Sequence, residues 1–208
     1  MKIKKPIISI LESTVLNKSL LVTPMQNFNF EGIYDDTLSF QDITIDSCKF
    51  NKINFINTSF KRCFFIDVIF DGCDLSNIDF SKMLFQRVNF RDCKLVGTSF
   101  IEASFKDVEF INCSSKYTNF SGSKIDKALF SASTFIESYF IDPNIKNIAF
   151  SKTNLQLSEF QNCKLDKVDF SDSNIDGIRI DLKSIKGITI DIFQSAQLVR
   201  LLGANIKE

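Results

Sequence analysis

The dominant feature of this sequence is a large apolar residue at every fifth position from Phe30 to Ile190, without a change of phase. Of these 33 positions 20 are Phe, 7 are Ile and 4 are Leu, and the two exceptions are Asp35 and Ser115. A five-residue period matches neither the 3.6-residue period of an α-helix nor the two-residue period of a flat strand. The chain is therefore predicted to form a solenoid, in which each coil packs only on its neighbours.

A second column of small or β-branched residues lies two positions before most of the large apolar residues, as at Thr98 and Ala103. The other three positions of each pentad hold nearly all of the charge, so two side chains per pentad are expected to face inward and three outward. All six cysteines fall in the small column, which indicates buried structural thiols. They are Cys48, Cys63, Cys73, Cys93, Cys113 and Cys163.

Runs such as Cys73-Asp74-Leu75-Ser76-Asn77 and Thr118-Asn119-Phe120-Ser121-Gly122 resemble the pentapeptide-repeat family. The resemblance implies an all-β solenoid, a right-handed quadrilateral β-helix in which four pentads form a square coil. Residues 30–190 would make about eight coils, and at a strand spacing of ~4.8 Å the rod would be roughly 40 Å long. We expect an N-terminal cap or extended segment at 1–29, the β-helix at 30–190, and a short C-terminal dimerisation helix with a tail at 191–208.

Residues twenty apart are expected to stack in ladders through the rod, each buried ring contributing on the order of 2 to 3 kcal/mol. Ser115 places a hydroxyl in the large apolar column and predicts a small void or a water there. Pro143 has no N–H to donate to a neighbouring coil and predicts an irregularity between 141 and 146. One expected core ladder contains Phe60, Phe80, Phe100, Phe120, Phe140 and Phe160.

The sequence contains no recognisable catalytic or metal-binding constellation. Because it has no His, Ser-His-Asp and Cys-His arrangements and most zinc hydrolase sites are excluded. A C-x-x-C pair, a phosphate loop and a G-x-G-x-x-G motif are also absent. A rod filled with Phe leaves no room for a substrate. We therefore expect no enzymatic activity, no cofactor, no metal and no small-molecule substrate.

The charge balances at 25 basic and 25 acidic residues, which argues against a generic electrostatic interaction with nucleic acid or acidic lipid. Residues 1–29 carry a net +3 and residues 30–190 a net −3. Seven lysines share one face in the twenty-residue frame, either to bind an anion or only to keep the rod soluble. They are Lys106, Lys124, Lys127, Lys146, Lys164, Lys167 and Lys186, and only Asp107, Asp126 and Asp166 lie among them.

The first residues contain an apolar run that is too short for a secretion signal, because Pro6 precedes it and Glu12 ends it. No stretch approaches the 18 consecutive apolar residues of a membrane-spanning helix. We expect a soluble, cytoplasmic protein that makes no contact with a membrane.

The period stops after Ile190, and residues 191–203 are predicted to form a short helix, with Asp191 as N-cap and Gly203 as its C-terminal stop. Its apolar residues are too many for one stripe, so one side is expected to close the open end of the rod and another to meet a second copy. The residues expected at this dimer interface are Ile192, Phe193, Gln194, Leu198, Leu201, Leu202 and Gly203.

A Gln followed by Leu-rich turns and a Leu-Gly pair is similar to the tail of the topoisomerase-binding pentapeptide-repeat proteins of the Qnr and MfpA types. The resemblance implies a homodimeric rod that imitates a DNA duplex, binds DNA gyrase or topoisomerase IV and modulates quinolone resistance. The unbroken phase implies a rod without loops, as in the MfpA type. The first alternative is an interaction scaffold with an unrelated protein partner, and the second is an anion-binding surface on the lysine face.

The net charge limits how such mimicry could work. Duplex DNA carries one charge per ~1.7 Å, so a mimic of its charge density roughly 40 Å long would need about twenty net negative charges. Since the repeat region has a net charge of −3, mimicry would have to use the shape of the rod and a local acidic patch. Direct binding of nucleic acid by the chain itself is not expected.

Overall fold

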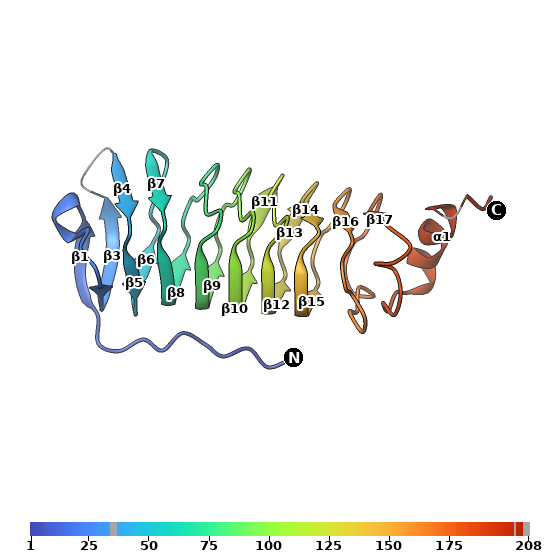
Figure 1. Ribbon diagram of the computed structural model, residues 1–208, viewed down its shortest axis with the longest axis horizontal. Coiled ribbons are helices and arrows are strands. Elements are labelled where there is room, and N and C mark those ends of the chain that lie inside the picture. Colours follow the sequence, from blue (N-terminus) through green and yellow to red (C-terminus); the bar gives the residue numbers. More distant parts are fainter. Residues whose placement is uncertain (34–36, 202, 206–208) are drawn as a thin grey trace.

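The computed structural model describes residues 1–33, 37–201 and 203–205, and shows a β-solenoid of about eight turns with an α-helix at its C-terminal end (Figure 1). The predicted right-handed quadrilateral β-helix is confirmed. Asp35, one of the two exceptions in the apolar column, lies outside the described residues. Within the part of the chain that the structure describes, no helix is long and apolar enough to cross a bilayer.

The strands are short, because each side of a coil is only about one pentad long. In chain order the elements are β1 Glu12–Leu16, a 3-10 helix at Lys18–Leu20, β2 Met25–Gln26, β3 Phe28–Ile33, β4 Leu38–Gln41, β5 Thr44–Asp46, β6 Lys49–Asn51, β7 Thr58–Lys61, β8 Phe64–Asp71, β9 Leu84–Arg91, β10 Ser104–Ile111, β11 Ser114–Lys116, β12 Lys124–Ser131, β13 Thr134–Ile136, β14 Tyr139–Ile141, β15 Asn144–Ser151, β16 Glu159–Gln161, β17 Arg179–Ile180 and α1 Ile192–Leu201.

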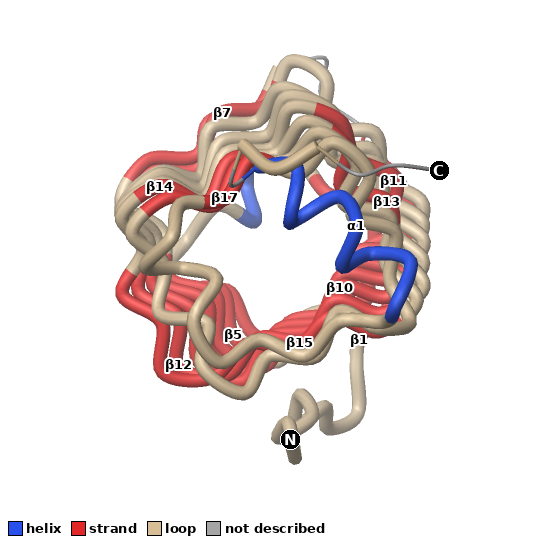
Figure 2. The backbone as a smooth tube through the Cα atoms, turned by 90° about the vertical axis from the view of Figure 1, so that its right-hand side faces the viewer, coloured by secondary structure: helices blue, strands red, loops and turns tan. Residues whose placement is uncertain are grey.

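All pairs among the described strands are parallel, and along most of the rod the partners are twenty residues apart. Phe65 pairs with Phe85, for example, and Phe85 with Phe105. Viewed along the axis, successive coils therefore lie over one another (Figure 2). A coil of twenty residues thus carries each pentad position onto the same position of the next coil, which keeps the apolar column inside.

The regular coils begin before Phe30. Met25 pairs with Ile45 and is fully buried, so it occupies the same apolar column five residues earlier. Strand β1 pairs with β3 at a shorter offset, with Glu12 opposite Phe28. The first coil is thus tighter than the others.

At most corners the chain turns at the second residue after a large apolar residue, and this second residue adopts the left-handed backbone region, as Arg62 does with a φ of +52°. Gly97 takes this position with a φ of +68°. Asn147 departs from the rule, because its φ is not positive as the φ of Lys127 is. At this point the register slips, and Asp126 pairs with Asn147 instead of the residue before it.

The slip skips Lys146, because Ile125 pairs with Ile145 and Asp126 with Asn147, so it lies inside the window from 141 to 146 in which we expected an irregularity. The reason given for it, a lost bond between coils at Pro143, is wrong. The residues one and two coils earlier, Ser123 and Ala103, donate their N–H groups within their own turn, to Phe120 O at 3.2 Å and Phe100 O at 3.1 Å. Pro143 therefore removes a local turn bond, because the N–H at this position is not part of the backbone hydrogen bonding between coils.

The interior of the rod is filled by stacked rings. Residues in one column stack nearly parallel, with Phe140 and Phe160 4.6 Å apart between centroids at an interplanar angle of 3°. Rings in adjacent columns meet edge to face, as do Phe120 and Phe130 at 5.6 Å and 87°, an arrangement that aromatic quadrupoles favour. All six rings of the ladder expected from the sequence are at most 7% exposed: Phe60, Phe80, Phe100, Phe120, Phe140 and Phe160.

Ser115 is buried in the large apolar column opposite Phe135. Its hydroxyl donates to Leu95 O at 3.0 Å and contacts the hydroxyl of Thr118. The polar group is therefore hydrogen-bonded, as a buried hydroxyl must be. The void or water expected beside it stays a prediction.

Candidate functional site

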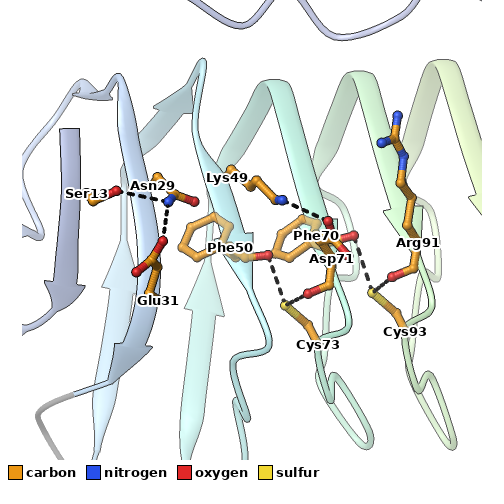
Figure 3. Close-up of polar contacts among 10 residues, drawn as sticks. All are labelled: Ser13, Asn29, Glu31, Lys49, Phe50, Phe70, Asp71, Cys73, Arg91 and Cys93. Atoms are coloured by element: carbon orange, nitrogen blue, oxygen red, sulfur yellow. Dashed lines mark hydrogen bonds and ion pairs between the residues drawn. The ribbon is translucent and has the colours of Figure 1, made fainter. Parts of the chain in front are cut away.

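The small column supplies hydrogen-bond donors to the backbone of the coil before it. The thiol of Cys73 lies 3.3 Å from Phe50 O, and the thiol of Cys93 lies 3.5 Å from Phe70 O (Figure 3). Thr98 makes the same bond at 2.9 Å to the carbonyl 23 residues earlier. The Cys and Thr residues of this column can thus satisfy their polar hydrogens inside the rod, while Ile, Val and Ala occupy the same position elsewhere without a donor.

All six cysteines are buried and free. Burial raises the pKa of the Cys48 thiol from 9.0 to about 11 and that of Cys163 to about 12. Because the thiolate is the reactive and metal-binding form, these environments hold the cysteines in their unreactive state. Among the described residues, no group of three or more His, Cys, Asp or Glu is placed to hold a metal ion.

The C-terminal helix α1 contacts the last coils through the buried Leu198, a bond from Gln197 to Asp176, and the side chain of Gln194. Its amide nitrogen donates to Phe170 O at 2.8 Å and to Ser173 O at 2.7 Å, and the residue is 7% exposed. Its amide oxygen accepts the N–H of Asp191 at 2.9 Å, and the Asp191 carboxylate accepts the N–H of Gln194 at 2.8 Å. This reciprocal pair is a capping box, so the same Gln starts the helix and closes the rod.

Another side of α1 exposes apolar residues to solvent, with Ile192 77% and Phe193 83% exposed. Leu201 is 50% exposed, but it lies three residues after the buried Leu198 and therefore on the face of α1 that is turned toward the rod. α1 ends at Leu201, and Gly203 beyond it has a φ of +80° and donates its N–H to Arg200 O at 3.0 Å. The expected division of the helix into a side against the rod and a free apolar side is present.

The residues expected at a dimer interface divide between these two sides. The expectation that Gln194 and Leu198 contact a second copy is corrected, because both are buried against the rod within one chain and are not available to a partner. Helical geometry places them four residues apart on one face. Ile192, Phe193, Leu201 and Gly203 are exposed, and Leu202 lies outside the described residues.

The N-terminal segment, residues 1–11, runs along the outside of the rod across several coils (Figure 1). We call residues 1–10 the strap. The backbone N–H of Ile7 donates to the Asp67 carboxylate at 2.8 Å, and that of Lys4 donates to the Asp107 carboxylate at 3.0 Å. Both carboxylates are almost fully covered, with residue exposures of 5% and 3%.

A third buried carboxylate binds a side chain of the strap. Glu109 is 3% exposed and forms an ion pair with Lys5 at 2.5 Å. Ile3 is the strap residue that is buried, whereas Ile7 and Ile10 are 67% and 94% exposed. The sequence pattern marked Asp107 only as an acid among the lysines and did not single out Asp67 or Glu109, because nothing local to these residues indicates what covers them.

Two hollows open on the lysine face. One, of about 410 Å³, is lined by Lys106, Lys124 and Lys146 among others, and the second, of about 450 Å³, by Lys146, Lys164 and Lys167 together with Met1. Acidic neighbours reduce the positive charge of this face: Asp126 lies 3.8 Å from Lys146, and Asp107 lies 3.9 Å from Lys127. Exposed pairs of this kind add little stability.

Comparison with known families agrees with the square coils and the five-residue register. A profile described as pentapeptide repeat region matches residues 63–134 and 122–190, and one for pentapeptide repeats in eight copies matches residues 40–82. The chain belongs to the pentapeptide-repeat family. No curated protein matches the sequence.

The chain is similar to several known structures. A trypsin-treated variant of QnrB1, described as a plasmid-mediated fluoroquinolone resistance protein, is 21% identical, with 96% of this chain and 98% of that one covered and a TM-score of 0.50. Rfr23 from the cyanobacterium Cyanothece is 15% identical over 59% and 90%, with a TM-score of 0.42. HetL from the cyanobacterium Nostoc, described as involved in heterocyst differentiation regulation, is 12% identical over 81% and 89%, with a TM-score of 0.40. At these identities the likeness extends to the fold alone.

Proposed function

We propose that this chain is a non-enzymatic, homodimeric rod that binds a type II topoisomerase, either DNA gyrase or topoisomerase IV, and modulates quinolone susceptibility. The observation that carries the proposal is the exposed apolar face of α1 at the end of the rod. Among the described residues, the strands of the rod follow one another without an inserted loop. The resemblance of the tail to topoisomerase-binding members supports the proposal. So does the match to a fluoroquinolone resistance protein over nearly the full length of both chains.

A dimer follows from the physical chemistry of α1. Burying a side chain such as Phe193 or Ile192 gains about 1.5 to 3 kcal/mol. Around a two-fold axis the same patch is buried on both copies, so each residue contributes twice. Two rods joined end to end through this helix would extend roughly 80 Å at ~4.8 Å per coil, which gives a long convex surface for a partner.

The dimer is tested by the mass of the particle in solution. Wild-type protein should scatter light as twice the 23.7 kDa chain, and Phe193→Asp should scatter as a monomer with an unchanged circular dichroism spectrum. Ile56→Asp is the matched control, because Ile56 is an apolar side chain 70% exposed on the rod, far along the chain from α1. A monomeric wild-type chain, or equal effects of the two variants, would remove the dimer from the proposal.

The topoisomerase is tested by a supercoiling assay with purified DNA gyrase, with and without a quinolone. We expect micromolar protein to inhibit supercoiling or to relieve the effect of the drug, and Phe193→Asp to lose this activity. An absence of both effects would remove the topoisomerase and leave a scaffold for an unrelated protein partner. Salt-sensitive retention of DNA that Lys127→Glu with Lys167→Glu abolishes would instead support an anion-binding lysine face.

A further inference from the structure

One corner of the rod alternates between acceptors and donors from coil to coil. Acceptor groups stand at every second coil and hydroxyl or cationic groups stand between them. In order along the rod the corner residues are Asn27, Ser47, Asp67, Arg87, Asp107, Lys127, Asn147 and Lys167. Each of two cations lies near the acid of the coil before it, Arg87 to Asp67 at 2.6 Å and Lys127 to Asp107 at 3.9 Å. Two acidic acceptors, Asp67 and Asp107, thus lie two coils apart on this corner.

This repeat matches the spacing of an extended peptide. Two coils at ~4.8 Å span about 10 Å, and three residues of extended chain at ~3.3 Å per residue span the same distance. The strap uses this match: Lys4 and Ile7 are three residues apart, and their N–H groups bind Asp107 and Asp67, which are two coils apart. The corner therefore recognises a main chain lying along the rod axis, by groups that any residue except Pro supplies.

Selectivity for charge comes from Glu109. Its side chain is 4% exposed, whereas the Lys5 side chain that binds it is 61% exposed. The carboxylate is held in place by the rod, and the cation that neutralises it is supplied by a solvated, flexible side chain. A bound segment therefore needs a basic residue directly after the residue whose N–H binds Asp107, as Lys5 follows Lys4. The surface does not require that this segment be the strap.

The strap fills this surface incompletely. Ile7 and Ile10 are 67% and 94% exposed, and Lys4 and Lys5 also extend into solvent. Apart from Ile3, the strap is held mainly by hydrogen bonds and an ion pair, whose net contributions in partly exposed sites are small. A segment with the same donors and a better apolar fit would therefore compete with it.

We propose that the corner formed by Asp67, Asp107 and Glu109 is a binding surface for an extended basic segment of a partner protein, and that the strap occupies it in cis. Glu109 facing Lys5 provides the charge complementarity, and Asp67 and Asp107, which Arg87 and Lys127 already approach, accept the main-chain N–H groups of the strap. The inference concerns a surface different from α1 and holds whether or not the partner is a topoisomerase. Release of the strap exposes the three carboxylates together.

The test uses full-length chains and a labelled peptide with the sequence of residues 1–10. Lys5→Glu places a carboxylate against Glu109 and weakens the strap, so this chain should bind the peptide about tenfold more tightly than the wild-type chain, whose site is occupied most of the time. Glu109→Lys should reduce binding of this peptide by about tenfold or more, and a peptide carrying Lys5→Glu should recover it, because the pair is reversed. This recovery also shows that the Glu109→Lys chain is folded.

A second probe tests recognition of the main chain. The same peptide with N-methyl groups at Lys4 and Ile7 lacks the two donors and should bind about tenfold more weakly to the Lys5→Glu chain. Equal binding of all peptides to all chains, or no binding to any, would overturn the proposal. Concentration-dependent exchange of straps between copies, seen as larger particles that added peptide dissociates, would replace the partner protein by a second copy of this chain.

Discussion

The replacement Gln194→Ala tests how the C-terminal helix is attached, because it removes one side chain that makes three hydrogen bonds. The Gln194 amide nitrogen binds two carbonyl groups of the preceding coils, at 2.8 Å and 2.7 Å, and its oxygen accepts an N–H at the start of the helix. A hydrogen bond of this kind contributes about 0.5 to 1.5 kcal/mol net, and a helix cap about 0.5 to 2 kcal/mol. Because α1 regains some hydration on release, we expect a total loss of about 2 to 4 kcal/mol.

Hydrogen exchange of the backbone amides of α1 measures this loss directly. At 1.4 kcal/mol per factor of ten, the opening equilibrium of the helix should increase by about 30- to 1000-fold. Exchange in β10, in the middle of the rod, should be unchanged, since coils contact only their neighbours. Local opening of this kind is the quantity that native-state exchange reports.

The matched control is Gln197→Ala, on the same helix, where the side chain bonds to Asp176 at the surface. This change should alter the opening free energy of α1, as measured by hydrogen exchange, by less than about 1 kcal/mol. Two results would refute the reasoning. One is an α1 that exchanges at the wild-type rate in Gln194→Ala, and the other is equal effects of the two substitutions.

Two further predictions concern residues inside the coils. Burial raises the pKa of Cys48 to about 11 and that of Cys163 to about 12, so the unfolded chain loses these protons at a lower pH than the folded chain, and the free energy of unfolding, intact below pH 9, should fall as the pH rises toward 11 and 12. Urea unfolding across this pH range should show a smaller decline in the double variant Cys48→Ser with Cys163→Ser. An equal decline would count against the assigned burial. Pro143→Ala should change the free energy of unfolding by less than about 1 kcal/mol, because an N–H group at this position bonds only within a local turn. A larger gain in stability would mean that Pro143 removes a hydrogen bond between coils.

The inward and outward assignment of residues could be predicted from the sequence because the solenoid is a one-dimensional repeat. A residue such as Phe100 meets the same environment as Phe80 and Phe120 on the neighbouring coils, so a local period specifies a tertiary position. The prediction for Pro143 failed on a finer point. Periodicity says which side chains face in, but it does not say whether the N–H at a given position bonds within the turn or to the next coil.

The parts of the surface that depend on distant segments could not be predicted in this way. Lys4 and Asp107 are 103 residues apart and meet because the strap lies across the coils, a path that no period encodes. The alternation of Asp67, Arg87, Asp107 and Lys127 at twenty-residue intervals was a usable signal in the sequence. For α1, apolar content indicated two covered sides, but only the structure shows that Gln194 and Leu198 face the rod.

The central claim is that one residue in five lines a filled interior, so that the protein acts through its outer surface. Urea unfolding of Phe100→Asp and Asp92→Lys, followed by circular dichroism, tests it most directly. Phe100 is fully buried among rings, and a carboxylate there should abolish cooperative folding, since an unpaired buried charge costs several kcal/mol against a total stability of about 5 to 15 kcal/mol. Asp92 is exposed at a left-handed turn position, and lysines occupy the equivalent position of other turns, at Lys82 and Lys127. The free energy of unfolding of Asp92→Lys should therefore stay within about 0.5 kcal/mol of wild type. Equal tolerance of both substitutions would contradict the account.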